Sequence, residues 1–224
     1  MIENLLYKFD PNADIVHFHK QMEPHLRKLF PNVKRIEWTA NVIRGGDKFG
    51  DQPRALGPHL DYHQNDSMRL DFHKNGREPL EGLLPSLKVF NQTEPHYLMG
   101  IHDNKDSKLG VLLGVWKPLE PEEVCDYPLA VMDARTMRYE DQQLNKFSIN
   151  FGLLTFNNLG ATIIHSPKQK WYYYPYQNTR EVLIFHQYSR SKLFANPHTS
   201  FFNKNCPEGT QKRISIENRV ALFF

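Results

Sequence analysis

Two residue types that bind metals stand two positions apart in the segment 57–61, which reads Gly-Pro-His-Leu-Asp. His59 and Asp61 form the only His-x-Asp pattern in the chain. Side chains two apart on a β-strand point to the same face of a sheet, so this pair could bind one ion. A chain with eleven histidines can contain this spacing by chance, and two polar residues on a sheet edge are the alternative interpretation.

A third ligand is available in the strand-like stretch 196–201, which reads Asn-Pro-His-Thr-Ser-Phe. Two histidines and one carboxylate on one face of an iron(II) ion leave coordination positions open, the arrangement of non-haem iron oxygenases. A bidentate 2-oxo acid and dioxygen can fill those positions. The residues therefore indicate His59, Asp61 and His198 as metal-binding and catalytic residues, although His165 or His186 on predicted strands could replace His198.

The far carboxylate of 2-oxoglutarate needs a buried cation, and a planar guanidinium matches its geometry. Arg213 and Ser215 lie two apart on a predicted strand beyond His198, so both side chains could reach that carboxylate. Glu217 and Arg219 share the same strand face. Arg219 is therefore either an ion-pair partner of Glu217 or the cosubstrate clamp itself, and Arg213 is the favoured clamp.

Other side chains could contact a substrate. Trp116, Trp171 and Tyr173 could line an apolar pocket, which small-molecule sites favour, although aromatic residues on strands more often fill a core. Arg135 is also a candidate substrate contact. With Asp133 it more readily forms a structural pair at the end of a strand.

The hydrophobic pattern predicts a helix over 12–30 that ends at Pro31, and favours a second helix near 79–90. The first helix carries His17 and His19, which imitate a cupin metal motif. Residues two apart on a helix diverge by about 200°, so these histidines could not share an ion. Strands are predicted at 33–44, 57–63, 109–116, 128–133, 147–156, 161–165, 170–175, 181–188, 195–202 and 213–223.

Turn residues separate these strands, for example at 45–47, 157–160 and 207–209. Many short strands after a helix favour a mainly β protein, either a barrel or a double-sheet jelly roll, rather than a βαβ sheet. We expect one domain over 1–224, in which an extension over 1–50 packs on a jelly-roll core over 51–224.

The composition excludes several other classes. The net charge is only +3 and the basic residues are dispersed, so no nucleic-acid partner is expected. No apolar stretch approaches the ~20 residues that cross a bilayer, so no membrane partner is expected either. Two cysteines without a CxxC pattern do not form a disulfide framework. The residues from Met1 to Leu6 do not resemble a signal peptide, which predicts a cytoplasmic protein.

Several blocks, in order along 57–224, resemble one family, the CmcJ/AsaB/gibberellin desaturase-like family of Fe(II)/2-oxoglutarate-dependent oxygenases. Beyond the His59 region, the blocks are 115–119 (Val-Trp-Lys-Pro-Leu), 126–135, 170–175 (Lys-Trp-Tyr-Tyr-Tyr-Pro), 181–185, 197–201 and 213–219 (Arg-Ile-Ser-Ile-Glu-Asn-Arg). The chain departs from the family at Gly114 and Lys117, where the family has Asn-x-Trp-Arg-Pro. It also departs at Gln169, where the family usually has His, and at Ser189, where it tends to have Asp.

The resemblance implies a mainly β fold with a double-stranded β-helix core, a cupin-like jelly roll with flanking helices. The ligands of Fe(II) that it implies are His59, Asp61 and His198. It also implies an oxidoreductase that decarboxylates 2-oxoglutarate to succinate, consumes dioxygen and removes hydrogen from an unactivated C–H bond. Such a dioxygenase would act as a hydroxylase or desaturase on a small organic molecule of secondary metabolism.

Two other functions are compatible with the residues. One is a non-catalytic β-barrel that binds a small ligand or a protein, although a silent relative is expected to lose part of the ligand set. The other is a cupin-like metal enzyme that does not use 2-oxoglutarate, in which Arg213 would be unnecessary.

Overall fold

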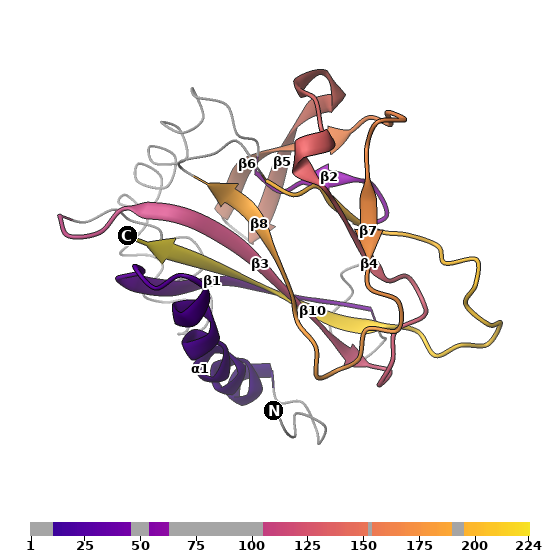
Figure 1. Ribbon diagram of the computed structural model, residues 1–224, viewed down its shortest axis with the longest axis horizontal. Helices are drawn as coiled ribbons and strands as arrows, with labels where there is room; N and C mark the ends of the chain where they lie inside the picture. The colour runs from indigo at the N-terminus through magenta and orange to yellow at the C-terminus, as the bar shows by residue number, and fades with distance from the viewer. Residues whose placement is uncertain (1–10, 46–53, 63–104, 152–153, 190–194) are drawn as a thin grey trace.

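The structure, a computed structural model, describes residues 11–45, 54–62, 105–151, 154–189 and 195–224 (Figure 1). Helix α1 comprises Pro11–Leu29, which confirms the helix predicted over 12–30. Strands β1 to β10 comprise Arg35–Arg44, His59–Leu60, Leu109–Glu120, Leu129–Met132, Gln142–Phe151, Leu154–Ile163, Trp171–Tyr173, Leu183–Ser189, His198–Ser200 and Ile214–Phe223. Two short 3-10 helices cover Ala134–Thr136 and Tyr139–Asp141. The helix favoured near 79–90 lies outside the described residues.

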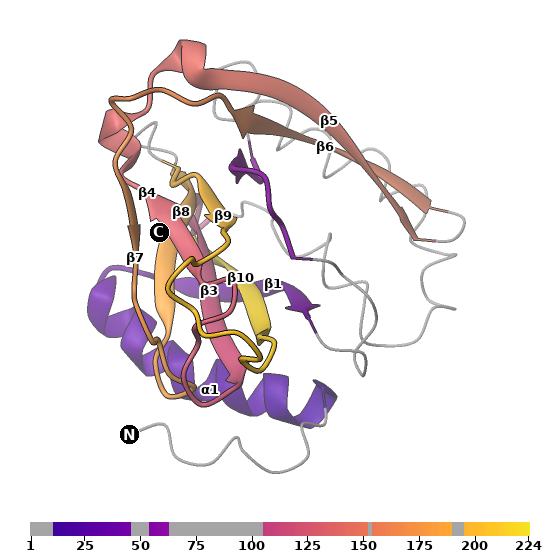
Figure 2. The ribbon, with the colours of Figure 1, turned by 90° about the vertical axis from the view of Figure 1, so that its right-hand side faces the viewer.

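The strands form two antiparallel sheets. A four-stranded sheet has the order β1-β10-β3-β8, and a six-stranded sheet has the order β5-β6-β2-β9-β4-β7. Strands from both sheets line one internal cavity, so the two sheets face each other. Figure 2 shows α1 beneath β1, β3 and β10, with β5 and β6 at the top of the view, opposite α1. This double antiparallel layer is the mainly β architecture that the sequence predicts.

Helix α1 covers the outer face of the four-stranded sheet. Phe18, Met22 and Leu26 are buried at helical spacing, and they pack against Val220 and Leu222 of β10 and against apolar residues of β3. This packing explains why the helix forms here, because its apolar stripe has a sheet to cover. In the described part of the chain, no helix combines the length and the apolar composition needed to span a membrane.

The position of α1 also fixes which side chains of β10 point inward. Side chains alternate along a strand, so burial of Val220 and Leu222 against α1 turns the odd-numbered residues toward the six-stranded sheet. Arg213, immediately before β10, and Glu217 line the internal cavity, as this alternation requires. Arg219, two residues further on, contacts Asp61 next to the six-stranded sheet.

The prediction for residues 147–160 was wrong. One strand was predicted over 147–156 and a turn over 157–160, whereas residues 142–151 and 154–163 form the two strands of a hairpin. Phe151 pairs with Leu154, so only residues 152 and 153 connect the strands. Gly152 in this connection is a turn signal, but the apolar residues on both sides of it continue the pattern of a single strand. The Asn and Gly residues of 157–160 lie within β6, where pairing with β5 outweighs their turn propensity.

We expect Leu26→Ala to destabilise the fold much more than Leu29→Ala. Leu26 is fully buried between α1 and the sheet, whereas Leu29 is 60% exposed at the end of the same helix. Removing a buried leucine costs about 2–5 kcal/mol, whereas an exposed substitution costs within about 0.5 kcal/mol. Urea unfolding of the two variants measures the difference, and equal losses would contradict the docking of α1.

Candidate metal centre

The six-stranded sheet brings His59, Asp61 and His198 together. His59 lies on β2, His198 lies opposite it on the neighbouring strand β9, and Asp61 follows directly after β2. One ligand atom from each of the three lies within 4.8 Å of the other two. The alternatives for the distal position do not join this cluster, since His165 is exposed and His186 belongs to β8 of the other sheet.

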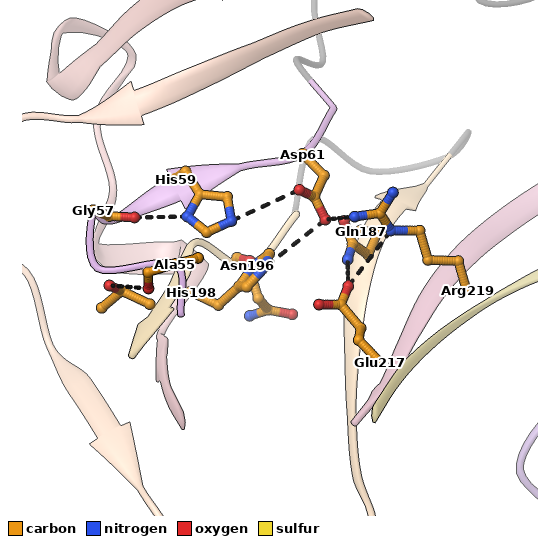
Figure 3. A network of polar contacts seen from close by, with 10 residues as sticks. Ala55, Gly57, His59, Asp61, Gln187, Asn196, His198, Glu217 and Arg219 are labelled. Atoms are coloured by element: carbon orange, nitrogen blue, oxygen red, sulfur yellow. Dashed lines mark hydrogen bonds and ion pairs between the residues drawn. The ribbon is translucent and has the colours of Figure 1, made fainter. Parts of the chain in front are cut away.

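Both imidazoles present the same nitrogen to this cluster (Figure 3). Nε2 of His59 lies 3.7 Å from one carboxylate oxygen of Asp61, and Nε2 of His198 lies 3.7 Å from the other. Nδ1 of His59 lies 2.6 Å from the carbonyl oxygen of Gly57, and Nδ1 of His198 lies 3.2 Å from that of Asn196. A carbonyl oxygen only accepts, so each Nδ1 carries a hydrogen, and the neutral form of each ring has its lone pair on Nε2.

The described part of the chain offers no hydrogen-bond partner to Nε2 of His198, although this atom is buried. A buried nitrogen with a free lone pair is costly unless something binds it. A divalent cation placed between the two imidazoles and the carboxylate would do so. This orphaned atom shows that the three residues fit a metal ion.

The electrostatics keep the ligands in the forms that bind a metal. Burial alone would raise the pKa of Asp61, but the positive charge of Arg219 and the two histidines outweigh burial and lower it. Burial, with a smaller contribution from His198, lowers the pKa of His59. At neutral pH the site therefore holds a carboxylate and a neutral His59, the forms that coordinate a divalent ion.

A polar network from the opposite sheet surrounds the Asp61 carboxylate (Figure 3). The Nη2 atom of Arg219 on β10 donates to Oδ2 of Asp61 at 2.8 Å. Nε of Arg219 lies 3.5 Å from Oε1 of Glu217, which also accepts a 2.8 Å hydrogen bond from Gln187 on β8. Arg219, one of the two predicted clamp residues, is therefore hydrogen-bonded to a candidate ligand and ion-paired with Glu217.

A small pocket, partly open to solvent, adjoins this cluster. It is lined from both sheets, and the lining includes His59, His198, Trp116, Ser200, Arg213 and Glu217. Arg213 is 1% exposed, and its Nη2 atom donates to Oγ of Ser200 at 3.2 Å. Its Cζ atom lies 5.3 Å from the centre of the Trp116 ring. The cavity thus has metal-binding side chains in its wall and a cation beside them.

The charge of Arg213 is poorly compensated. Its Nε and Nη1 atoms are buried, and within the described residues neither has a hydrogen-bond acceptor. Burial and the positive charge of Arg54 lower the pKa of Arg213 to about 9. Asp126 accepts from the backbone N–H of Arg213 at 3.1 Å, but its carboxylate is paired with Arg54 at 2.7 Å. A buried guanidinium with unused donors is energetically costly, and an anionic ligand that accepts from those donors would remove that cost.

The other predicted substrate contacts are placed differently. Trp116 lines the cavity, but Trp171 packs against the apolar cluster of Leu60 and Met132. Tyr173 is 42% exposed and meets Phe201 edge-on. Arg135 is exposed, and its guanidinium donates to both carboxylate oxygens of Asp133, the structural pair that the sequence favoured.

Sequence reasoning missed Ser200 and Gln187. Ser200, rather than the predicted Ser215, supplies the hydroxyl that contacts Arg213, and Ser215 is not among the residues that line the cavity. The signal for Ser200 was present, because it lies two residues after His198 on the same strand face. Gln187 carried no such signal, since only the pairing of β8 with β3 in the opposite sheet brings it near Asp61.

A departure from the family pattern has a visible role beside His198. The ring of Phe185 on β8 packs 4.7 Å from the imidazole of His198. A Cβ atom at Gly114 would lie 2.5 Å from that phenyl ring. Glycine, where the family has asparagine, therefore leaves room for Phe185 to support His198.

The fold and the cluster of His59, Asp61 and His198 define a mainly β, jelly-roll protein with a candidate centre for a divalent metal. A family model described as "Oxidoreductase/YMDC permease-like domain" matches residues 104–223. The chain belongs to this family.

Two curated relatives are fungal proteins. Aspirochlorine biosynthesis protein N of Aspergillus oryzae (strain ATCC 42149 / RIB 40) is 30% identical over 118 residues, which are 50% of this chain and 48% of the relative. The Fe(II)/2-oxoglutarate-dependent dioxygenase nvfI of Aspergillus novofumigatus (strain IBT 16806) is 32% identical over 124 residues, 49% of this chain and 39% of the relative. The matched segments span less than half of the length of either relative. These relatives confirm the resemblance that the sequence motifs carry.

Solved structures confirm the fold class. A single-residue variant of the iron and alpha-ketoglutarate-dependent endoperoxidase NvfI superimposes with a TM-score of 0.69 at 22% identity, over 96% of this chain and 69% of that one. NvfI in a different conformation gives a TM-score of 0.68 at 21% identity, over 96% and 70%. The jelly-roll expectation is therefore correct.

We expect Asp61→Asn to weaken Mn(II) binding to the metal-free protein severely. The substitution keeps the size of the side chain but removes the charge that a divalent ion needs. The loss should exceed the roughly 10- to 100-fold that follows removal of an outer partner of a ligand. Electron paramagnetic resonance of free Mn(II) measures the affinity. Asp133→Asn, which also unpairs an arginine from a carboxylate, is the matched control, and similar affinities of the two variants would exclude Asp61 as a ligand.

Proposed function

We propose that this protein is an Fe(II)/2-oxoglutarate-dependent dioxygenase that hydroxylates or desaturates a small organic substrate. His59, Asp61 and His198 would hold the iron. The observation that carries the proposal is the pairing of this ligand cluster with the buried, under-bonded guanidinium of Arg213 in one cavity. A metal site alone would fit many enzymes, whereas this combination fits a metal-binding dicarboxylate.

The two ends of 2-oxoglutarate match the two ends of the site. Its 2-oxo acid end has the chemistry of a bidentate metal ligand, and its other end is a carboxylate. Arg213 offers unused donors to that carboxylate, and Ser200 adds a hydroxyl. Arg219 already binds the carboxylates of Asp61 and Glu217, so its role is different. The difference between the free donors of Arg213 and the paired guanidinium of Arg219 supports Arg213 as the cosubstrate clamp.

When bound, iron(II) with 2-oxoglutarate and dioxygen supplies oxidative decarboxylation and the oxidation of a C–H bond. The side chains of this chain prepare the site for that chemistry. The backbone carbonyls of Gly57 and Asn196 hold the imidazoles with Nε2 toward the ion. Trp116 and the buried sheet interior keep water from the guanidinium of Arg213, which strengthens its attraction for an anion.

The substrate class rests on the relatives. One is named for aspirochlorine biosynthesis and another is titled an endoperoxidase. We therefore propose a small secondary-metabolite-like molecule as the substrate of this chain, with dioxygen as the second partner. Since the matched segments cover less than half of each curated relative, the reaction outcome is best tested directly on this chain.

We expect anaerobic addition of Fe(II) and 2-oxoglutarate to give a weak visible charge-transfer band, and aerobic addition to give succinate. Arg213→Met should weaken 2-oxoglutarate binding by about 10- to 100-fold, since a hydrogen bond to a charged group contributes roughly 1.5–3 kcal/mol. The band titrated with 2-oxoglutarate gives the affinity, and Arg135→Met is the exposed control.

Three outcomes would argue against this function. Absence of any cosubstrate-dependent band in folded, metal-loaded protein would favour a non-catalytic binding protein. Metal-dependent activity that does not require 2-oxoglutarate and survives Arg213→Met would favour a cupin-like metal enzyme. Unchanged 2-oxoglutarate affinity in Arg213→Met would place the clamp elsewhere.

A further inference from the structure

We propose that Arg219 is a positioning residue for the metal, which acts through the carboxylate of Asp61 with the help of Gln187 and Glu217. The inference rests on the proposed function, because it assigns Asp61 as an iron ligand. It adds that the cation, the amide and the second carboxylate of the opposite sheet set the orientation of that ligand.

The contacts of Asp61 divide its two oxygens. Oδ1 faces Nε2 of His59 at 3.7 Å, whereas Oδ2 lies 3.7 Å from Nε2 of His198 and accepts a 2.8 Å bond from Arg219. The side chain of Gln187 also hydrogen-bonds Asp61. A carboxylate held from behind by these donors cannot rotate freely, so its oxygens stay directed toward the imidazoles (Figure 3).

The negative charges of Asp61 and Glu217 explain why the cation of Arg219 lies between them. Asp61 and Glu217 bring two carboxylates into the space between the sheets, and their side chains are 15% and 8% exposed. Two like charges in one partly buried space repel each other unless a cation lies between them. The guanidinium of Arg219 lies 2.8 Å from the first carboxylate and 3.5 Å from the second. It therefore bridges the two carboxylates and holds Asp61 in place beside the two imidazoles.

Arg213 and Arg219 therefore have separate tasks, although they point to the same interior. Arg213 has buried donors with no acceptor in the described structure, as a ligand-binding cation should. The guanidinium of Arg219 is hydrogen-bonded to Asp61 and ion-paired with Glu217, as expected of a residue that positions a ligand. Loss of Arg219 should affect the metal, and loss of Arg213 should affect the cosubstrate.

This separation is tested by binding, without turnover. Metal-free wild type, Arg219→Met, Arg219→Lys and Arg213→Met are titrated with Mn(II) by electron paramagnetic resonance. Co(II) absorption then reports the coordination of the bound ion. We expect Arg219→Met to weaken Mn(II) binding by about 10- to 100-fold and to change the Co(II) spectrum. Arg219→Lys should recover part of the affinity, because it restores the positive charge but not the planar guanidinium with its several donors. Arg213→Met should bind Mn(II) like wild type.

Thermal melting of each metal-free protein shows whether it is folded. If Arg219→Met does not fold, Arg219→Lys and Gln187→Leu, which removes the amide from Asp61 and Glu217, decide the question by the same criteria. Wild-type Mn(II) affinity and an unchanged Co(II) spectrum in the folded Arg219 or Gln187 variants would overturn the inference. A wild-type protein that binds Mn(II) but shows no 2-oxoglutarate-dependent band would instead overturn the proposed function.

Discussion

Charged groups between two facing sheets are the constraint on which the site depends. The six-stranded sheet supplies the two imidazoles and Asp61, and the four-stranded sheet supplies Arg219, Glu217 and Gln187. Neither set is satisfied alone, since buried carboxylates need cations and buried cations need acceptors. Closure of the sandwich brings the two sets together. The outer face of β10 makes this possible, because its apolar residues are covered by α1.

Local spacing revealed much of the site in the sequence. His59 and Asp61 are two residues apart, and so are Arg213 and Ser215. Side chains at this spacing share one face of a strand, so each pair was predicted to point to the same side. The same rule placed Arg219 inside, but it could not separate the two arginines. Their difference depends on what the opposite sheet places in front of each, which is a property of the tertiary structure.

The fold class was predictable for a related reason, and the errors are instructive. The apolar stripe of α1 and the strand at 213–223 are long and regular, so their patterns are clear. The β5–β6 hairpin was missed because apolar residues lie on both sides of its two-residue connection while Asn and Gly lie inside a strand. Ser200 was overlooked in favour of Ser215, although both follow the same alternation. The choice between them needed the pairing of β9 with β2 and β4.

The ion pair between Arg219 and Asp61 joins the two halves of the sandwich at the point where a metal would sit. Any ion captured by His59, Asp61 and His198 thus draws on a carboxylate already tethered across the interior. Binding to the native state alone shifts the unfolding equilibrium by mass action. Loss of the metal would then lower the free energy of unfolding. The share of unfolded chains, which proteases can cleave, would rise as the metal is withdrawn.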